Sequence, residues 1–410
     1  MEKYVYNLEK DISKIRDDFP ILSRGIYLIS NSLGAVPAGT RERLLEFINI
    51  WETEGVAAWR SEWWDLARKT GNKIAGFLGA GEDEVTMLTN ATLCHWVALS
   101  TQFKNKDKKR NRIIMTSMDF PSIINAVSKI AEFMNWTVDI IDGKGGVGIN
   151  PDQVIDRIRD DTLFVATSHV YFKSAYIQDI QKIADYARGK GAYTLIDGYH
   201  APGIIPVDLH SFGVDFYVGG CLKWLCGGPG TAFLYVRPGI SSQLQPKLTG
   251  WLAHSSPFSF SLKMEYTRDS YRYMSGTPPI PCLYTALAGL EEINKVGISQ
   301  IRNKSVQMTN KIMQMAEDRG FPSFSPEKNE LRGGSVSLHI PSAFQVKQCL
   351  DERKIQVDFR KGEEKEPDVV RIGPHFYNTE EEINEFFDAI DEILSSGEFK
   401  RYSTNINHVT

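Results

Sequence analysis

The chain has 410 residues, of which 42% are hydrophobic and 24% are charged, the composition of an ordinary globular protein. Its formal net charge of −4 gives no electrostatic basis for binding nucleic acid or an acidic membrane surface. No apolar run approaches the roughly 20 residues that cross a bilayer, and the first residues lack the apolar core of a signal peptide. We therefore expect a cytoplasmic protein that binds neither nucleic acid nor membranes.

The five cysteines are odd in number and scattered along the chain, at Cys94, Cys221, Cys226, Cys282 and Cys349. Their spacing matches neither a disulfide framework nor the paired motifs of a zinc site. This distribution favours buried free thiols in a reducing compartment, and we expect no metal site.

The first part of the chain is expected to be largely helical. Residues 8–18 have a helical pattern, residues 25–30 resemble a short strand, and the turn Asn31-Ser32-Leu33-Gly34 follows. A long helical stretch is expected from about residue 40 to residue 78. Its tryptophans at helical spacing line either a substrate entrance or, as is more common, a core or an interface: Trp59, Trp63 and Trp64.

Between residues 85 and 236, short strand patterns alternate with helical patterns, which is typical of a mostly parallel sheet covered by helices on both faces. We expect seven strands, at residues 85–88, 112–116, 136–141, 163–169, 193–197, 216–219 and 231–236. The helices expected between them are 91–103, 122–134, 151–159 and 177–188.

From about residue 281 the pattern changes to that of a smaller α+β domain. Helices are expected at 281–296, 299–318, 343–352 and 380–394, and strands at 335–340, 355–359 and 369–372. We therefore divide the chain into an N-terminal segment that packs with the small domain (1–45), a large domain (46–280), a small C-terminal domain (281–398) and a tail (399–410).

Two strand ends carry the side chains that say most about function. Asp197 ends one expected strand, and Lys223 follows the next. Ligands gather at the carboxyl ends of strands in an open α/β sheet. A lysine that forms a Schiff base and a carboxylate that keeps a pyridine nitrogen protonated are what pyridoxal 5′-phosphate (PLP) requires. The sequence therefore predicts PLP bound covalently to Lys223, and chemistry around the Cα of an amino acid.

A lysine after a strand is most often a solvated surface residue. Here Leu222, Trp224 and Leu225 provide apolar neighbours, which disfavour the charged form and make the amine more nucleophilic. The turn Gly227-Gly228-Pro229-Gly230 lets the backbone pass close to a ligand. These neighbours favour cofactor attachment over the surface alternative.

Three further strand ends suit other parts of the cofactor. The loop Thr89-Asn90-Ala91-Thr92 offers amides and hydroxyls to a phosphate, although a simple helix N-cap explains it equally well. Phe120 either stacks on a planar ring or packs in the core, as a lone Phe usually does. Ser168 and His169 end another strand near the ring, where a structural histidine is the more common case.

Together these segments resemble the class V branch of the fold-type I PLP enzymes, and within it the kynureninase family, from about Asn31 to Phe387. Each matching segment is weak alone, but their order is specific: Asn31-Ser32-Leu33-Gly34, TNAT, DFPS, DGYHAPG, GGCLKWLCGGPG, GWLAH, GTPPI and RIGPHFYN. The resemblance implies a large domain with a mostly parallel seven-stranded sheet between helices, plus a smaller C-terminal α+β domain.

The resemblance also implies roles for individual residues. Lys223 forms the Schiff base and moves the Cα proton, Asp197 pairs with the pyridinium nitrogen, and His200 lies near the ring and its hydroxyl. The rest of the cofactor site is assigned to Phe120, stacked on the ring, and to Ala91 and Thr92, which hold the phosphate.

Other matching residues concern the partner subunit and the substrate. Trp251 and Thr277 resemble residues that reach the phosphate from the neighbouring subunit, which implies a homodimer with shared active sites; His254 would then face the interface. Arg371 resembles the arginine that clamps the substrate α-carboxylate, a role that suits its planar fork. Asn31 and Ser32 are also assigned to substrate binding.

Three positions depart from the kynureninase pattern. Kynureninases carry a tyrosine immediately before the Schiff-base lysine, where it contacts the phosphate and is implicated in proton transfer, and this chain has Leu222. They carry an aspartate after the FPS triplet, where this chain has Ile123. The segment Gly55-Val56-Ala57-Ala58 lacks the histidine expected to help recognise the kynurenine ring. We therefore expect a substrate other than kynurenine.

The expected reaction is cleavage at the β or γ carbon of an amino acid, by a hydrolase or a C–C or C–S lyase. Transamination, epimerisation and decarboxylation start from the same carbanion, and the sequence does not choose among them. A non-catalytic scaffold with this fold is a further alternative. The retention of Lys223, Asp197 and Arg371 argues against it.

Overall fold

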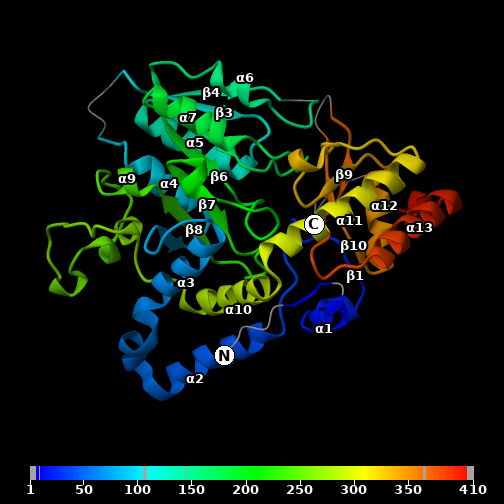
Figure 1. The fold of residues 1–410 in the computed structure, drawn as a ribbon, viewed down its shortest axis with the longest axis horizontal. Helices are drawn as coiled ribbons and strands as arrows, with labels where there is room; N and C mark the ends of the chain where they lie inside the picture. The colour runs from blue at the N-terminus through cyan, green and yellow to red at the C-terminus, as the bar shows by residue number, and fades with distance from the viewer. Residues whose placement is uncertain (1–5, 9, 105–108, 144, 363–365, 404–410) are drawn as a thin grey trace.

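The computed structural model describes residues 6–8, 10–104, 109–143, 145–362 and 366–403. Figure 1 shows a large sheet flanked by helices and a smaller lobe formed by the C-terminal part of the chain, with the N-terminal segment beside that lobe. Residues 404–410 of the expected tail lie outside the described residues. None of the described helices is both long and apolar enough to cross a membrane.

The large sheet has the seven strands expected from the sequence, in the order β2-β8-β7-β6-β5-β3-β4. The five strands from β4 to β7 in this order run parallel to one another, whereas β8 is antiparallel to both β7 and β2. The bounds are β2 (Val85–Leu88), β3 (Arg112–Thr116), β4 (Thr137–Ile141), β5 (Thr162–Ser168), β6 (Tyr193–Asp197), β7 (Phe216–Gly220) and β8 (Ala232–Val236). The α/β class and the mostly parallel sheet are confirmed.

Both faces of this sheet are buried because successive residues of a strand point to opposite sides. In β3, Ile113 and Met115 join the buried cluster under α4 (Ala91–Ser100) and α5 (Pro121–Met134). Ile114 joins the cluster under α6 (Pro151–Ile155) and α7 (Ile180–Gly189) instead. With both faces covered, a ligand can approach the strands only at their ends.

The helical stretch expected over residues 40–78 is present, but it is divided into two α-helices. The chain forms α2 (Gly39–Glu54) and α3 (Trp64–Phe77), joined by a 3-10 turn (Gly55–Ala57) and a π-helical turn (Trp59–Trp63). Gly55 ends α2 with a φ of 55°, a left-handed conformation that glycine adopts without steric cost. The apolar spacing continues across the break, so periodicity alone did not reveal it. Helix α10 (Ile280–Val296) packs against both α2 and α3.

The smaller lobe contains an antiparallel sheet in the order β11-β12-β9, formed by β11 (Asp358–Arg360), β12 (Val369–Ile372) and β9 (Val336–Leu338). The strand expected over 355–359 is divided, because β10 (Ile355–Gln356) pairs in parallel with β1 (Ile26–Tyr27) instead. The remaining α-helices are α1 (Ile12–Asp17), α8 (Leu209–Phe212), α9 (Pro238–Ser241), α11 (Ile298–Asp318), α12 (Ala343–Glu352) and α13 (Glu380–Ser396).

The N-terminal segment links the small lobe to the turn that carries the candidate lysine. Arg16 in α1 donates to the carbonyl of Tyr377 and to a carboxylate oxygen of Glu382, each over 2.8 Å. The amide of Gly34 donates to the carbonyl of Leu222 over 2.8 Å. A Cβ at Gly34 would lie 2.1 Å from the Lys223 carbonyl, so only glycine allows this approach.

Candidate active site

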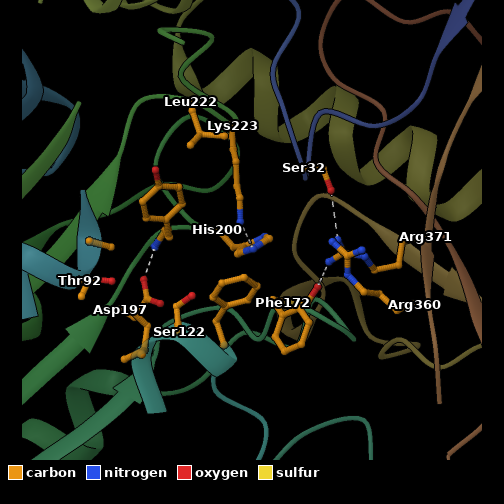
Figure 2. Close-up of a pocket in the computed structure, with 14 residues that line it drawn as sticks. Ser32, Thr92, Ser122, Phe172, Asp197, His200, Leu222, Lys223, Arg360 and Arg371 are labelled. Carbon is orange, nitrogen blue, oxygen red and sulfur yellow. Dashed lines mark hydrogen bonds between the residues drawn. The ribbon is translucent and has the colours of Figure 1, made fainter. Parts of the chain in front are cut away.

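A cavity of about 370 Å³ lies at the carboxyl ends of β6 and β7, a volume within the range of small-molecule sites (roughly 300–1,000 Å³). Figure 2 shows that the large lobe provides one wall, with Thr92 and Asp197, and that Arg360 and Arg371 from the small lobe provide the opposite wall. The lining residues are Ser32, Ala91, Thr92, Phe120, Ser122, Ile123, Phe172, Asp197, Tyr199, His200, Leu222, Lys223, Arg360 and Arg371.

Lys223 extends into the middle of this cavity (Figure 2). Its Nζ lies 2.5 Å from Nε2 of His200 and 4.9 Å from the ring centroid of Tyr199. Desolvation by the surrounding protein lowers the pKa of the Lys223 amine, the charge of Arg371 lowers it further, and the charge of Asp197 opposes both. A lysine held this way is more readily deprotonated than an exposed one and is therefore a better nucleophile.

His200 is buried beside this amine. Burial lowers its pKa well below the ordinary value for histidine, and the positive charges of Lys223 and Arg371 act in the same direction. The imidazole is therefore neutral, and its Nε2 accepts the hydrogen bond from Lys223 Nζ when the ring proton is on Nδ1. It can hold the amine in place without competing for a proton.

Asp197 ends β6, in the sheet between β5 and β7. Its Oδ1 accepts a hydrogen bond of 2.9 Å from the amide of Tyr199, whereas Oδ2 has no hydrogen-bond partner among the described residues. Burial raises the pKa of the Asp197 carboxyl, and that hydrogen bond and the Lys223 charge oppose the rise. A buried carboxylate with one oxygen left over fits a cationic N–H donor in the cavity.

Helix α4 begins at the cavity wall. Asn90 caps it, since its side chain accepts from the amide of Leu93 over 2.9 Å, and Ala91 and Thr92 line the cavity. The N-cap explanation of this loop is therefore correct, and it coexists with a position suited to an anion. The first amides of a helix are free to donate, and the helix dipole favours negative charge there.

Phe120 lies at the start of α5, lines the cavity and is 37% exposed. Lys223 Nζ lies 5.6 Å from its ring centroid, and Phe172 packs edge-on against it at 5.2 Å. Asp119, which precedes Phe120, holds this loop in place through hydrogen bonds to the ends of β3 and β5. Its Oδ1 accepts from the amide and hydroxyl of Ser168 (2.7 and 2.8 Å), and its Oδ2 accepts from the amide and hydroxyl of Thr116 (both 2.9 Å).

Arg371 is almost fully buried in the opposite wall. Its Nε donates to Oδ2 of Asp358 over 2.7 Å, and one terminal nitrogen donates to the same oxygen. The terminal nitrogens also donate to the carbonyl of Phe172 and, over 3.2 Å, to the hydroxyl of Ser32. Asp358 also lies 2.8 Å from a terminal nitrogen of Arg360. Burial lowers the pKa of Arg360 to about 10, as does the charge of Arg371, while Asp358 opposes the change. This wall carries two guanidinium groups around one carboxylate.

Several residues assigned from the sequence lie outside the cavity of this chain. Asn31 is fully buried against Gly373, and Ser168 is bound to Asp119. Trp251 packs with other aromatic residues on the surface, and Thr277 is exposed. The ring of His169 is bound to the Tyr217 hydroxyl over 2.9 Å, and that of His254 to the Ser256 amide over 2.8 Å; these are structural arrangements.

The structure also places four residues at the site that the sequence did not single out: Tyr199, Phe172, Asp358 and Arg360. The pair Asp358 and Arg360 left a weak signal, because residues two apart on a strand face the same side and a charged pair in an apolar strand is unusual. Tyr199 lies inside the DGYHAPG segment, next to residues that were chosen. Phe172 left no local signal.

Fold and cavity together define a fold-type I enzyme, with an amine and a carboxylate at neighbouring strand ends opposite an arginine wall. The sequence model of the class V aminotransferases matches residues 26–386, and the chain belongs to this family. Class V aminotransferases are PLP enzymes, so PLP is the cofactor of this protein. The cavity fits it, since Lys223, the free oxygen of Asp197 and the start of α4 present an amine, an acceptor and an anion site.

Two curated relatives cover almost the whole chain. A kynureninase from Pseudomonas fluorescens is 28% identical over 413 residues, which span 98% of this chain and 96% of the relative. A protein from Bacillus subtilis (strain 168) described as the uncharacterized aminotransferase YcbU is 29% identical, over 93% of this chain and 96% of the relative.

Two solved structures share the fold. A cysteine desulfurase from Thermococcus onnurineus NA1 superposes with a TM-score of 0.81 at 20% identity, over 94% of this chain and 98% of that one. The cystine C-S lyase C-DES, in complex with its product cysteine persulfide, gives a TM-score of 0.80 at 20% identity, over 91% of this chain and 98% of that one. At this identity the likeness concerns the fold alone.

Proposed function

We propose that this PLP enzyme cleaves the side chain of a small amino acid at the β or γ carbon, as a hydrolase or a C–C or C–S lyase, and that kynurenine is not its substrate. The observation that carries the proposal is the position of the Lys223 amine. It has a lowered pKa and lies between the Asp197 wall and the arginine wall. Such an amine can both hold a carbonyl cofactor and move a proton at the substrate Cα.

The cofactor would be held by residues of the large lobe. Lys223 attaches it, Oδ2 of Asp197 accepts from its ring nitrogen, and Phe120 packs against its ring. The amide of Ala91 and the hydroxyl of Thr92 donate to its phosphate at the start of α4. When bound, PLP withdraws the electron pair that remains at Cα after a proton is removed.

The substrate carboxylate would bind at the opposite wall. Arg371 offers a planar fork of donors, and Ser32 adds a hydroxyl 3.2 Å from it. With the carboxylate fixed there, the substrate amine and Cα extend toward Lys223 in the middle of the cavity. Asp358 fixes the plane of the Arg371 fork through the Nε hydrogen bond, and His200 keeps the lysine amine pointed into the cavity.

Two lining residues support a substrate other than kynurenine. Leu222 and Ile123 both line the cavity, and they stand where kynureninases carry a tyrosine and an aspartate. An apolar pair at these positions removes two polar contacts and favours a smaller or less polar side chain. The name kynureninase among the relatives supports side-chain cleavage. The relative described as an aminotransferase makes transamination the second candidate.

We propose further that two copies of the chain form a dimer with shared active sites. Residues 251–264 carry a group of exposed apolar side chains, here called the aromatic surface: Trp251, Phe258, Phe260, Leu262 and Met264. In Figure 1 this yellow-green segment projects from the large lobe on the side away from the small lobe. Contiguous exposed apolar surface of this kind is typical of a protein interface.

The five free cysteines support a reducing compartment such as the cytoplasm.

The central test is spectroscopic. Purified protein with PLP is expected to absorb visible light through the lysine-bound cofactor, and borohydride is expected to fix that cofactor to Lys223. Lys223→Ala should abolish both properties, whereas Lys129→Ala, an exposed lysine on α5, should change neither. Wild-type protein that shows no visible band with excess PLP would exclude the catalytic function and leave a scaffold role.

The reaction is tested by a substrate screen with product identification. Side-chain cleavage releases a fragment and leaves a shorter amino acid or 2-oxo acid, whereas transamination yields a 2-oxo acid with the side chain intact. We expect cleavage of a small amino acid and weak spectral change with kynurenine. Efficient turnover of kynurenine would overturn the argument from Leu222 and Ile123.

A further inference from the structure

Tyr199 lines the cavity but has no role in the site described so far. Its amide donates to Asp197, while the far end of its ring lies against Gly220 at the end of β7. A Cβ at Gly220 would lie 2.4 Å from the Tyr199 hydroxyl oxygen, so glycine at this position leaves the space that the phenol occupies. The phenol therefore reaches from the end of β6 across to the turn that carries Lys223.

The hydroxyl lies at the α4 end of the cavity. Leu88 at the end of β2 and Gly220 at the end of β7 both pair with Ala232, so α4, which follows β2, begins at the same edge of the sheet as the end of β7. Cys221, which follows β7, and Cys94, in the first turns of α4, both interact electrostatically with the Tyr199 hydroxyl. Both guanidinium groups that line the cavity, those of Arg360 and Arg371, lie at the other wall (Figure 2).

Tyr199 is prepared to donate a hydrogen bond. Burial raises the pKa of its phenol, and the neighbouring thiols and Asp197 raise it further, so the group stays protonated. Within the described part of the chain, the hydroxyl has no hydrogen-bond partner. A donor that is largely removed from water and gains no partner carries a free-energy cost. An acceptor in the cavity would remove that cost.

We propose that the Tyr199 hydroxyl donates a hydrogen bond to the cofactor phosphate, together with the amide of Ala91 and the hydroxyl of Thr92. This inference rests on the cofactor placement given under Proposed function. A phosphate dianion at the α4 end has no arginine beside it among the described lining residues of this chain. It therefore depends on neutral donors, and each one contributes more than it would beside a compensating cation.

The test compares PLP with pyridoxal, which has the same ring and aldehyde but no phosphate. Cofactor-free protein is titrated with each ligand, and binding is followed by visible absorbance and tryptophan fluorescence. Tyr199→Phe keeps the ring and removes only the hydroxyl. We expect its affinity for PLP to fall about ten- to a hundredfold, as for loss of a hydrogen bond to a charged group, with its affinity for pyridoxal unchanged.

Tyr235→Phe is the matched control, since it removes a buried phenolic oxygen in β8 that does not line the cavity. Its affinity for both ligands should equal that of the wild type, and thermal melting checks the fold of each variant. Equal affinity of Tyr199→Phe and wild type for PLP would overturn the inference. An equal loss for both ligands would also overturn it, because the hydroxyl would then act on the ring or on the fold. Wild-type protein that binds neither ligand would instead refute the cofactor placement itself.

Discussion

The pKa of the Lys223 amine is set by one large effect and several smaller ones. Burial lowers its pKa most, the charge of Arg371 lowers it next, and the charges of Asp197 and Asp358 raise it. The neutral amine is the form that attacks an aldehyde. The residue that we assign to the substrate carboxylate therefore also tunes the nucleophile, from the other side of the cavity.

This coupling makes a prediction about pH. Arg371→Gln removes a positive charge that lowers the pKa of Lys223, and it leaves Asp358 less compensated, which raises that pKa as well. Both effects have the same sign, so the amine of the variant should deprotonate at higher pH. The rate at which cofactor-free protein reacts with pyridoxal, measured against pH, should have its midpoint shifted upward. Arg319→Gln, at an exposed ion pair with Asp391, is the control, and an unshifted or lowered midpoint for Arg371→Gln would contradict the coupling.

A second prediction concerns the shape of the Arg371 side chain. Arg371→Lys keeps a positive charge but loses the planar fork that a carboxylate fits. We expect kcat/KM for the amino-acid substrate to fall by about a hundredfold, corresponding to about 2.7 kcal/mol. The visible spectrum of the bound cofactor should be unchanged. A spectrum altered as strongly as turnover would mean that Arg371 acts on the cofactor rather than on the substrate.

At the scale of elements, one buried carboxylate joins the ends of β3 and β5. Both oxygens of Asp119 accept from backbone amides and side-chain hydroxyls, so five donors converge on one side chain. Asp119 immediately precedes Phe120, which connects this junction to the cavity wall. The position of an aromatic ring at the site thus depends on a group that never touches the cavity.

We predict that Asp119→Asn is destabilising. The amide nitrogen would face donors where the carboxylate offered an acceptor, which should lower the free energy of unfolding by about 2–4 kcal/mol. PLP affinity should also fall, because Phe120 loses its support. Urea denaturation and PLP titration measure the two effects. Asp185→Asn, at an exposed ion pair on α7, is expected to change neither. A neutral effect of Asp119→Asn on unfolding would show that these hydrogen bonds are not structural.

Much of the sheet could be predicted from the sequence because short apolar strands alternate with helices, and Lys223 and Asp197 followed from their positions at strand ends. The break between α2 and α3 could not, since apolar spacing continues through it and Gly55 alone does not distinguish a break from a tolerated glycine. Phe172 could not either. It reaches the site through its contact with Arg371, which lies 199 residues further along the chain, and such a contact leaves no local pattern.

For the whole molecule, the aromatic surface is the feature that a single chain does not explain. Leu262 is fully exposed and Phe260 is 73% exposed. Trp251 stacks on Phe260 with a centroid distance of 6.1 Å, so these two exposed rings pack against each other. Burying such side chains against a second copy would contribute about 25 cal/mol for each Å² removed from water.

We predict that the wild type has a native mass of twice the 46.3 kDa chain mass. The double variant Phe260→Glu and Leu262→Glu should behave as a single chain and bind PLP more weakly, because Trp251 and Thr277 would no longer reach a neighbouring site. Phe133→Glu, at an exposed position on α5, should leave the mass unchanged. Light scattering measures the mass, and a wild-type monomer that retains full PLP affinity would refute the shared site.

The cavity is formed by three distant parts of the chain, and this has a consequence for biosynthesis. The cavity needs Ser32 from near the beginning of the chain, Lys223 from the middle and Arg371 from near the end. A ribosome-bound chain that has emerged only as far as β8 contains the lysine and the carboxylate but lacks the arginine wall. Such a chain lacks the guanidinium group that we assign to the substrate carboxylate. The substrate side of the pocket therefore matures last, after the polypeptide is almost completely synthesised.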